Sequence, residues 1–269
     1  MKYQVGIIGA GFAGLVAALQ LKKSGRSSFV IFERAAEPGG TWRDNVYPGC
    51  ACDVASPLYS FAGEPNPHWN RLYADQRDIL QYIKDVVQKH NLHEHIRYNT
   101  EVAGARFQKR AGGWEITDAG GHTTFVNVLI AGTGPLNRPC IPGFPGLALF
   151  RGKIFHSSAW DHDCDLAGKK VAVIGTGASA IQIIPAIAPK VSRLFVFQRT
   201  PPWVSERADR FITPSQQSRW KRFPFLLRLQ REKIYWLNEL LGLGFIGQEL
   251  VNRLMRIVVS RRLTKQVKD

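Results

Sequence analysis

The chain has few cysteines and no long apolar runs. Four of its 269 residues are cysteines (Cys50, Cys52, Cys140 and Cys164), and their spacing contains no paired zinc-ligand pattern. So few cysteines in a long chain argue against a disulfide framework, and we expect a reducing, cytoplasmic compartment. No run of about 18 apolar residues occurs and no signal-peptide pattern opens the chain, so we expect no membrane span and no leader.

Acidic residues are also scarce. The chain has 21 Asp and Glu residues against 36 Lys and Arg, and residues 201–269 hold 14 basic against 6 acidic residues. Such a surplus favours nucleic-acid binding, attraction of an anionic dinucleotide, or a separate acidic part of the protein. No recognition motif supports the first reading, so we expect no nucleic-acid partner. The charge by itself therefore selects no function.

A dinucleotide-binding pattern opens the chain. Residues 4–8 are predicted as a buried strand, residues 15–22 as a helix and residues 29–32 as a second strand. Between the first strand and the helix stands G-x-G-x-x-G, from Gly9 to Gly14, and Glu33 closes the second strand. The glycines allow a pyrophosphate to approach the helix N-terminus, and the acid accepts hydrogen bonds from ribose hydroxyls. A carboxylate repels a 2′-phosphate, so this site suits FAD or NAD.

The segment from Gly39 to Asp53 follows that strand directly. It is too rich in Gly, Pro and aromatic residues to predict a helix or a central strand. Glycines let the backbone approach a flat ring, Trp42 offers a stacking face, and Asp53 brings a charge to a largely apolar site. An irregular connector is the alternative reading, but the position at the end of a dinucleotide-binding strand favours a cofactor loop.

The middle of the chain predicts a helix followed by a small antiparallel meander. Residues 75–89 have Ile79, Ile83, Val86 and Val87 on one helical face, with Tyr82 beside them. Residues 102–107, 114–117 and 124–130 are predicted as strands, and the last leads to a glycine turn at Gly134. His90, His93 and His95 are expected to be solvated, and no metal site is predicted.

A second dinucleotide unit begins at Lys170. Strand 171–174 leads into G-x-G-x-x-A, from Gly175 to Ala180, followed by helix 181–187 and strand 194–197. Arg199 stands where Glu33 stands in the first unit, and a guanidinium there favours a 2′-phosphate. The two units together indicate a flavoprotein that is reduced by NADPH.

Residues 211–269 are basic and predicted helical. Apolar positions include Tyr235, Trp236, Leu254, Ile257 and Val258, with Lys and Arg between them. A helical insertion packed on the nucleotide domain is favoured; a monotopic membrane helix or the wall of a substrate channel is the alternative. A nucleic-acid surface has no motif to support it.

Two longer motifs carry a family resemblance. Gly39–Asp53 matches every fixed position of [A/G]-G-x-W-x-x-x-x-[F/Y]-P-[G/M]-x-x-x-D, and Phe150–Asp161 matches F-x-G-x-x-x-H-x-x-x-W-[P/D]. With the two flanking dinucleotide units, the chain resembles the type I Baeyer–Villiger monooxygenases from residue 5 to residue 200. The hydroxyacetophenone-monooxygenase-like branch is the most similar.

The resemblance implies cofactors and site residues. At the FAD site it implies Gly9, Gly11, Phe12, Ala13, Gly14, Glu33, Arg34, Gly40, Thr41, Trp42, Asp53, Tyr59, Val102 and Gly134. At the NADPH site it implies Gly175, Thr176, Gly177, Ala178, Ser179, Ala180, Ile181, Arg199 and Thr200. Ala51, Cys52 and Asp53 would lie between the two cofactors. His156 and Trp160, which the residues alone would make packing groups, would couple domain movement to the NADP site.

The implied reaction is insertion of one oxygen atom of O₂ into a ketone, giving an ester or lactone. By the resemblance, NADPH reduces the flavin, O₂ adds to give a C4a-peroxyflavin, and an arginine positioned by Asp53 stabilises the reacting groups. The alternatives are an S- or N-oxygenating flavin monooxygenase, which would act on a sulfide, and a non-catalytic truncated flavoprotein.

The chain departs from the family at its C-terminal end. The family's catalytic arginine and later strands follow the region where this sequence stops at Asp269, so we expect that arginine to be absent and the sheets to have open apolar edges. We therefore expect the chain alone to bind FAD weakly and to leave ketones unoxidised.

The resulting fold prediction is α/β, with two Rossmann-type dinucleotide-binding domains, a small antiparallel insertion and a C-terminal helical segment. The expected boundaries are 1–140 for the FAD-binding domain and 141–165 for a linker. Residues 166–210 are expected to form the NADP-binding unit and 211–269 the basic helical insertion.

Overall fold

The computed structural model describes residues 2–135, 137–201 and 207–243, together with residues 249, 253, 257 and 260. The chain forms two compact units. The first comprises Met1–Cys50 and Gln76–Leu166, and the second comprises Ala51–Asp75 and Ala167–Asp269. The predicted apolar positions Leu254 and Val258 lie outside the described residues.

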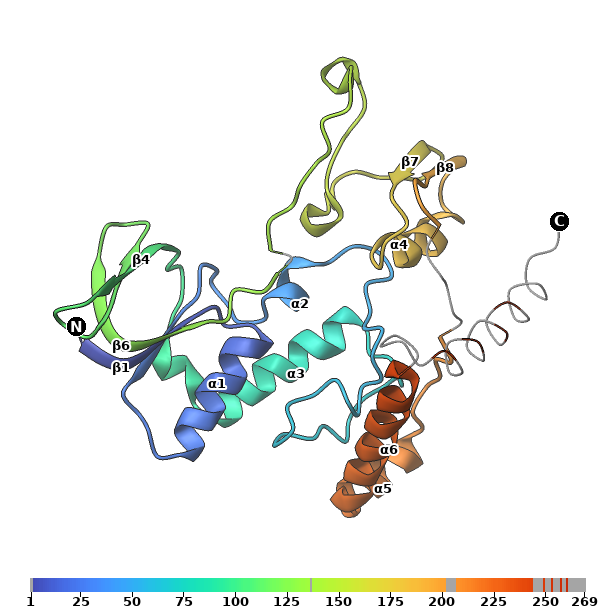
Figure 1. Cartoon of the computed structure of the whole chain (residues 1–269). Coiled ribbons are helices and arrows are strands. Elements are labelled where there is room, and N and C mark those ends of the chain that lie inside the picture. The colour runs from blue at the N-terminus through green and yellow to red at the C-terminus, as the bar shows by residue number, and fades with distance from the viewer. Residues whose placement is uncertain are drawn as a thin grey trace. The chain divides into compact units, whose positions relative to one another are not determined.

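The first unit is an α/β domain, shown in Figure 1 in blue for residues 2–50 and from turquoise to yellow for residues 76–166. Its elements are β1 (Lys2–Ile8), α1 (Phe12–Lys23), β2 (Phe29–Phe32), α2 (Thr41–Asp44), α3 (Gln76–Lys89), η1 (Leu92–His95), β3 (Ile96–Arg97), β4 (Val102–Gln108), β5 (Gly113–Asp118), β6 (Thr123–Ala131), η2 (Leu147–Leu149) and η3 (Ser157–Ala159). The predicted helices and strands are confirmed, with ends that differ by a few residues.

Six strands make one sheet in the order β3-β2-β1-β6-β5-β4. β1 pairs in parallel with β2 and β6, whereas β5 pairs antiparallel with both β4 and β6. The predicted meander is thus confirmed: β6 completes it and also returns to the parallel sheet beside β1. Because Ile7 pairs with both Ile31 and Ile130, the ends of β1, β2 and β6 lie at the same edge.

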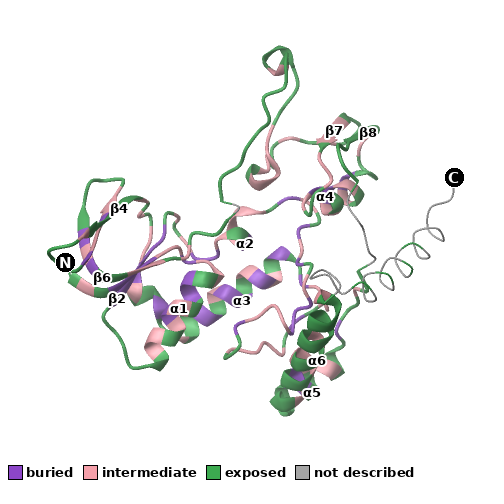
Figure 2. Ribbon diagram, viewed as in Figure 1, coloured by how far each residue is buried: buried purple, intermediate pink, exposed green. Residues whose placement is uncertain are grey.

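Burial follows the predicted hydrophobic patterns. Ile7, Ile31 and Val126 are fully buried in the sheet, and Figure 2 shows the buried residues concentrated in β1, β2 and the inner faces of α1 and α3. In α3 the buried residues are Gln76, Ile79, Tyr82, Ile83, Val86 and Val87. The aromatic rings of Phe12 in α1 and Tyr82 in α3 lie 6.5 Å apart, centroid to centroid.

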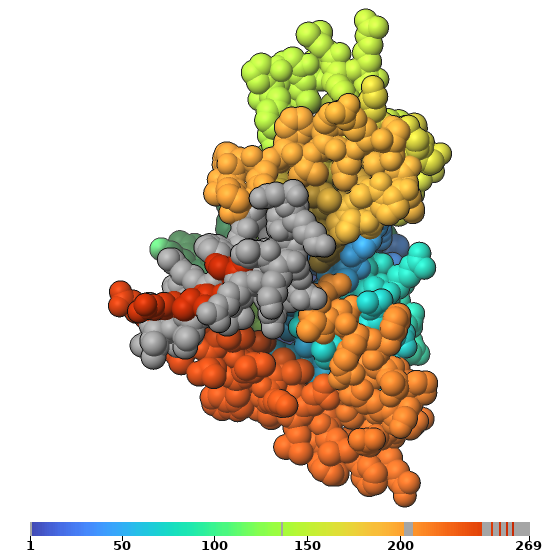
Figure 3. All heavy atoms as spheres, turned by 90° about the vertical axis from the view of Figure 1, so that its right-hand side faces the viewer, coloured from blue at the N-terminus to red at the C-terminus, as the bar shows by residue number. Residues whose placement is uncertain are grey.

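The second unit contains a two-stranded parallel sheet and a helical hairpin. Its elements are β7 (Lys170–Ile174), α4 (Ala180–Ile187), β8 (Arg193–Phe197), α5 (Pro214–Arg222) and α6 (Pro224–Gly242). The sheet exposes Ile174, Val196 and Phe197. Figure 3 shows the orange-to-red hairpin at the surface, where Leu229 and Trp236 of α6 are exposed.

Ala51–Asp75 belongs to the second unit, whereas the sequence placed these residues inside one FAD-binding domain of residues 1–140. The reason is backbone pairing with residues 210–212. The Leu72 amide donates to the Arg210 carbonyl at 2.9 Å, and the Ile212 amide donates to the Asn70 carbonyl at 2.9 Å. These bonds tie two segments together that are far apart in sequence. The polypeptide therefore leaves the first unit after Cys50 and returns to it at Gln76.

Candidate functional site

The first glycine turn is a close packing of backbone on backbone. Gly9 adopts a φ of 97°, and a Cβ added there would lie 2.6 Å from the carbonyl oxygen of Gly132. A Cβ on Gly14 would lie 1.9 Å from the carbonyl oxygen of Gly9. Side chains are therefore excluded where β1, the start of α1 and the loop after β6 meet.

Two sequence motifs converge at this turn. Gly40 has a φ of 52°, and a Cβ added to it would lie 3.1 Å from the Cα of Gly11. The Gly39 amide donates to the Ala10 carbonyl at 3.0 Å. The prediction that the segment 39–53 contains no helix is wrong at α2, because the four residues after the two glycines close one helical turn.

The N-terminus of α1 points out of this turn. Gly11 is its N-cap in an extended conformation, and among the described residues no side chain caps the helix. The first amides of a helix lack intrahelical acceptors and carry the positive end of the helix dipole. The turn thus combines close backbone approach with an anion-binding helix end.

Glu33 is held in a defined position beside the turn. Its side chain is buried and accepts hydrogen bonds from the amides of Ala10 (2.8 Å) and Ala35 (3.0 Å). Arg43 Nη1 also donates to Glu33 Oε1 at 2.9 Å. Because the same guanidinium binds the Glu37 carbonyl and Asp44, it links α2 to the end of β2.

Arg43 was not among the predicted site residues, although it stands inside the Gly39–Asp53 motif. Arg34, which was predicted, lies on the surface and pairs with Asp44 at 3.2 Å. The signal that identifies Arg43 is its spacing. It is a cation ten residues after Glu33, and Gly39 and Gly40, whose φ angles are positive, turn the chain between them.

The remaining residues predicted for the first site occupy varied surroundings. Trp42 is buried, and its carbonyl accepts a hydrogen bond from Gln76 Nε2. Thr41 and Ala13 are exposed at the starts of α2 and α1. Val102 packs against the core cluster of Val30, Phe32, Ile116 and Val126, and Gly134 has a φ of 73°.

The segment Ala51–Asp53 lies in the second unit. The Ala51 amide donates to Gln182 Oε1 at 3.1 Å, and Gln182 Nε2 donates to the Ala51 carbonyl at 2.9 Å. Arg207 Nη1 donates to the Cys52 carbonyl at 3.1 Å. Asp53 itself is exposed, and Tyr59 is half-buried in the same segment.

Cys52 has a strongly perturbed thiol. Burial raises the pKa of Cys52 to about 11, with a smaller contribution in the same direction from the charge of Asp53. Arg207 acts in the opposite direction. The thiol is therefore neutral at ordinary pH and acts as a small apolar packing group.

The glycine turn that begins at Gly175 shares one backbone hydrogen bond with the turn that begins at Gly9. The Gly175 amide donates to the Phe197 carbonyl at 2.8 Å, as the Gly9 amide does to the Phe32 carbonyl at 2.8 Å. Gly175 has a φ of 103°, and no described atom lies within 4 Å of a Cβ added to Gly175 or Gly177. The predicted residues of this turn and of the following strand end include several on the surface: Gly177, Ala178, Ile181, Arg199 and Thr200. Thr176, Ser179 and Ala180 are more buried.

His156 and Trp160 flank η3 in the first unit. His156 caps this short turn, accepting from the Ser158 amide at 3.2 Å, and the Trp160 ring packs edge-on against Phe155 at 5.1 Å. Both side chains therefore organise a local turn in the segment that was expected to link the domains.

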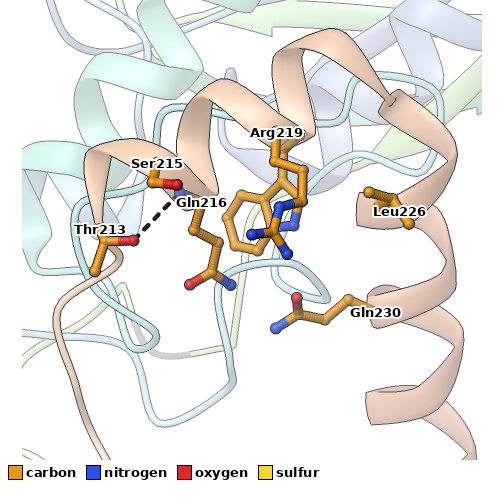
Figure 4. Close-up of a pocket in the computed structure, with 7 residues that line it drawn as sticks. Thr213, Ser215, Gln216, Arg219, Leu226 and Gln230 are labelled. Carbon is orange, nitrogen blue, oxygen red and sulfur yellow. Dashed lines mark hydrogen bonds between the residues drawn. The ribbon is translucent and has the colours of Figure 1, made fainter.

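A hollow of about 350 Å³ lies in the α5–α6 hairpin. Figure 4 shows its lining, in which Arg219 is the one charged side chain and the Thr213 hydroxyl accepts from the Gln216 amide at 3.2 Å. The other lining residues are Ser215, Trp220, Leu226 and Gln230. None of these residues was predicted to bind a ligand.

Within the described ranges, no group of three or more His, Cys, Asp or Glu side chains could hold a metal ion. His93 is exposed, and its Nδ1 lies 2.8 Å from the Tyr98 hydroxyl. His95 is half-buried and stacks on Phe29 at 4.0 Å, so it is packed rather than solvated as predicted. None of the described helices combines the length and apolar character that crossing a membrane requires.

Sequence comparison identifies relatives along the whole chain. The chain is 46% identical over 266 residues to a Baeyer-Villiger monooxygenase of Pseudomonas aeruginosa, covering 99% of this chain and 50% of that protein. A Baeyer-Villiger monooxygenase of Streptomyces coelicolor is 44% identical over 266 residues, with 99% and 51% covered. The chain thus spans about half the length of the curated relatives it matches.

Solved structures agree with these relatives. A steroid monooxygenase bound to NADP matches with a TM-score of 0.75 and 35% identity, covering 82% of this chain and 43% of that one. A mutant cyclohexanone monooxygenase from Rhodococcus sp. Phi1, bound to NADP⁺, matches with a TM-score of 0.77 and 35% identity, covering 83% and 44%. The model of the flavin-binding monooxygenase-like family matches residues 2–239. Together with the paired glycine turns, these matches confirm the predicted resemblance, and the chain belongs to the flavin-binding monooxygenase-like family.

Proposed function

We propose that this chain forms the FAD- and NADPH-binding part of a Baeyer–Villiger monooxygenase, which inserts one atom of O₂ into a ketone. The observation that carries the proposal is the backbone cradle of Gly9, Gly14 and Gly40 at the N-terminus of α1. A Cβ added at these glycines would lie as close as 1.9 Å to a backbone atom, so the cradle admits no side chain, as a site for a pyrophosphate requires.

The first unit would hold FAD through this cradle. Glu33 accepts three hydrogen bonds from the protein, which fix its carboxylate beside the turn for ribose hydroxyls. Gly11 keeps the approach to the helix end open, because a Cβ there would be in ordinary contact with Gly40 alone. Bound flavin supplies the activation of O₂; the protein's part is to bind it, orient it and exclude water.

The second unit would hold NADPH. Gly175 and Gly177 leave the start of α4 open to a phosphate, and Arg199 stands exposed at the end of β8. A guanidinium at that place favours the 2′-phosphate of NADPH over the free hydroxyl of NADH. Asp53 would position an arginine supplied by another part of the site.

The reaction is tested with protein from the whole reading frame that contains this chain. Purified protein would receive NADPH, O₂ and either cyclohexanone or thioanisole, and the products would be separated by gas chromatography. We expect lactone in proportion to NADPH consumed, and no reaction with NADH at the same concentration. Lactone in proportion to NADH as well would overturn the NADPH assignment but not the reaction.

Two other results would each overturn the ketone proposal. Sulfoxide without lactone would identify an S-oxygenating flavin monooxygenase. Stoichiometric FAD without any oxygenated product would identify a non-catalytic flavoprotein.

A further inference from the structure

The side-chain amide of Gln182 forms a two-bond clamp on the backbone of Ala51. Its oxygen accepts from the Ala51 amide at 3.1 Å, and its nitrogen donates to the Ala51 carbonyl at 2.9 Å. The two residues are 131 positions apart in sequence and belong to the same compact unit. Such a paired contact copies the bonding of one β-ladder residue and fixes both the position and the direction of the Ala51 peptide.

The place of Gln182 in the helix is unusual for a polar residue. It is the third residue of α4, which reads Ala-Ile-Gln-Ile-Ile over residues 180–184. The neighbouring Ala180 and Ile183 are buried, whereas Gln182 is half-buried and turned to a backbone. Both polar atoms of its side chain therefore have a partner on the backbone of Ala51.

The residue after Ala51 is held as well. The Cys52 amide donates to the Ala74 carbonyl at 2.9 Å, and the Cys52 carbonyl accepts from Arg207 at 3.1 Å. Asp53 then follows as an exposed carboxylate on a backbone whose two preceding residues are fixed. A shift of α4 would consequently move the backbone that carries Asp53.

We propose that Gln182 is a positioning residue that couples nucleotide binding at the glycine turn 175–180 to the placement of the 51–53 segment. The proposal rests on the NADPH site proposed above. The turn runs directly into α4, where the Ile181 amide donates to the Gly177 carbonyl at 3.1 Å and the Ile183 amide donates to the Ser179 carbonyl at 3.0 Å. A phosphate bound at the turn orders the start of α4 through these bonds, and with it Gln182 and, through the clamp, the peptide of Ala51. By linkage, fixing the segment strengthens nucleotide binding by the same factor.

Hydrogen exchange of the Ala51 amide tests the coupling, because that amide is one half of the clamp. Exchange would be measured in the 269-residue chain, with and without NADP⁺, for the unaltered protein and for Gln182→Met, which keeps the shape and removes both bonds. The matched control is Gln217→Met, which removes one bond of the same kind, from Gln217 Nε2 to the Trp69 carbonyl at 2.9 Å. Gln182→Glu, which keeps an acceptor but loses the donor, is the second variant if Gln182→Met folds poorly.

Without nucleotide, we expect Gln182→Met to speed Ala51 exchange by roughly tenfold to thirtyfold, with Gln182→Glu between it and the unaltered chain. The Gln217→Met control should leave it within about twofold of the unaltered rate, since its bond is made elsewhere. With NADP⁺, Ala51 exchange should slow further in the unaltered chain and in the control, but not in Gln182→Met.

Three negative results can be distinguished from one another. Exchange across residues 175–181 that NADP⁺ leaves unchanged in the unaltered chain would overturn the nucleotide site, and the coupling with it. A second result would overturn the coupling alone. In it, NADP⁺ slows exchange at residues 175–181, but the Ala51 amide responds to NADP⁺ equally in the unaltered chain and in Gln182→Met. An Ala51 amide that exchanges equally fast in both without nucleotide would overturn the clamp.

Discussion

The carbonyl oxygen of Gly9 occupies the space that a side chain on Gly14 would need, since a Cβ built on Gly14 lies 1.9 Å from it. The Gly9 oxygen and the added Cβ are both attached directly to the backbone, so neither can move aside without displacing β1 or α1. Gly14→Ala should therefore destabilise the chain by about 3 kcal/mol or more, as expected of overpacking against a fixed backbone. Urea unfolding measures this loss.

Gly11→Ala is the control for that variant. A Cβ on Gly11 would lie 3.6 Å from the Gly40 Cα, an ordinary contact, and its φ of −88° suits any residue. We expect a stability change within about 1 kcal/mol. Equal losses for the two variants would contradict the steric argument.

The buried pair of Arg43 and Glu33 should be far more sensitive than the surface pair beside it. The Glu33 side chain is only 5% exposed. Arg43→Met would leave its buried carboxylate without a cation, and we expect the free energy of unfolding to fall by about 3 kcal/mol. Arg34, whose side chain is 46% exposed, pairs with Asp44, and Arg34→Met should cost less than about 1 kcal/mol. Unfolding of both variants at pH 7 compares them, and equal losses would refute the ranking.

Arg199 should decide between the two nicotinamide dinucleotides. With Arg199→Ala, we expect NADP⁺ binding to weaken by roughly tenfold to a hundredfold, because a charge-assisted bond to the 2′-phosphate is lost. NAD⁺ binding, which lacks that phosphate, should change little. Calorimetric titration measures both affinities. The control is Arg193→Ala, which removes an exposed cation that lies over the Phe195 ring in β8. It should leave both affinities unchanged.

Cys52 should make stability fall at alkaline pH. Its pKa is about 11 in the folded chain against an ordinary 9.0, so below pH 9 the thiol is neutral in both states and its contribution is fully present. Between pH 9 and pH 11 the unfolded chain releases the proton and the folded chain retains it, so the free energy of unfolding falls by up to about 1.4 kcal/mol per pH unit.

Urea titrations of the unaltered chain and of Cys52→Ala between pH 8 and pH 10.5 would isolate this effect. The difference in stability between them should shrink as the pH rises. Parallel pH profiles would show that the Cys52 thiol ionises as readily in the folded chain as in the unfolded one.

Local patterns were sufficient to predict most elements of the fold. The strands around both glycine turns and the buried face of α3 follow from hydrophobic period and glycine spacing, which act within a few residues. The short helix α2 was missed because its composition disfavours a helix. Gly39 and Gly40, whose φ angles are positive, place the next residues in a single turn.

The site was predicted in type but not in its long-range partners. Glu33 and the glycines follow from a motif, whereas Arg43 and Gln182 depend on where separate segments meet in space. The grouping of residues 51–75 with the second unit likewise arises from pairing with residues 210–212, and no local signal in either segment announces it.

That grouping has a consequence for the order of events on the ribosome. Residues 51–75 emerge long before the residues near 210 with which they pair. At 5 to 20 residues per second, the wait is roughly 7 to 28 seconds. During this time the first unit's sheet gains its last strand, β6, which ends at Ala131, while residues 51–75 still lack their pairing with residues 210–212. During synthesis, the sheet of the first unit can therefore form well before residues 51–75 meet residues 210–212.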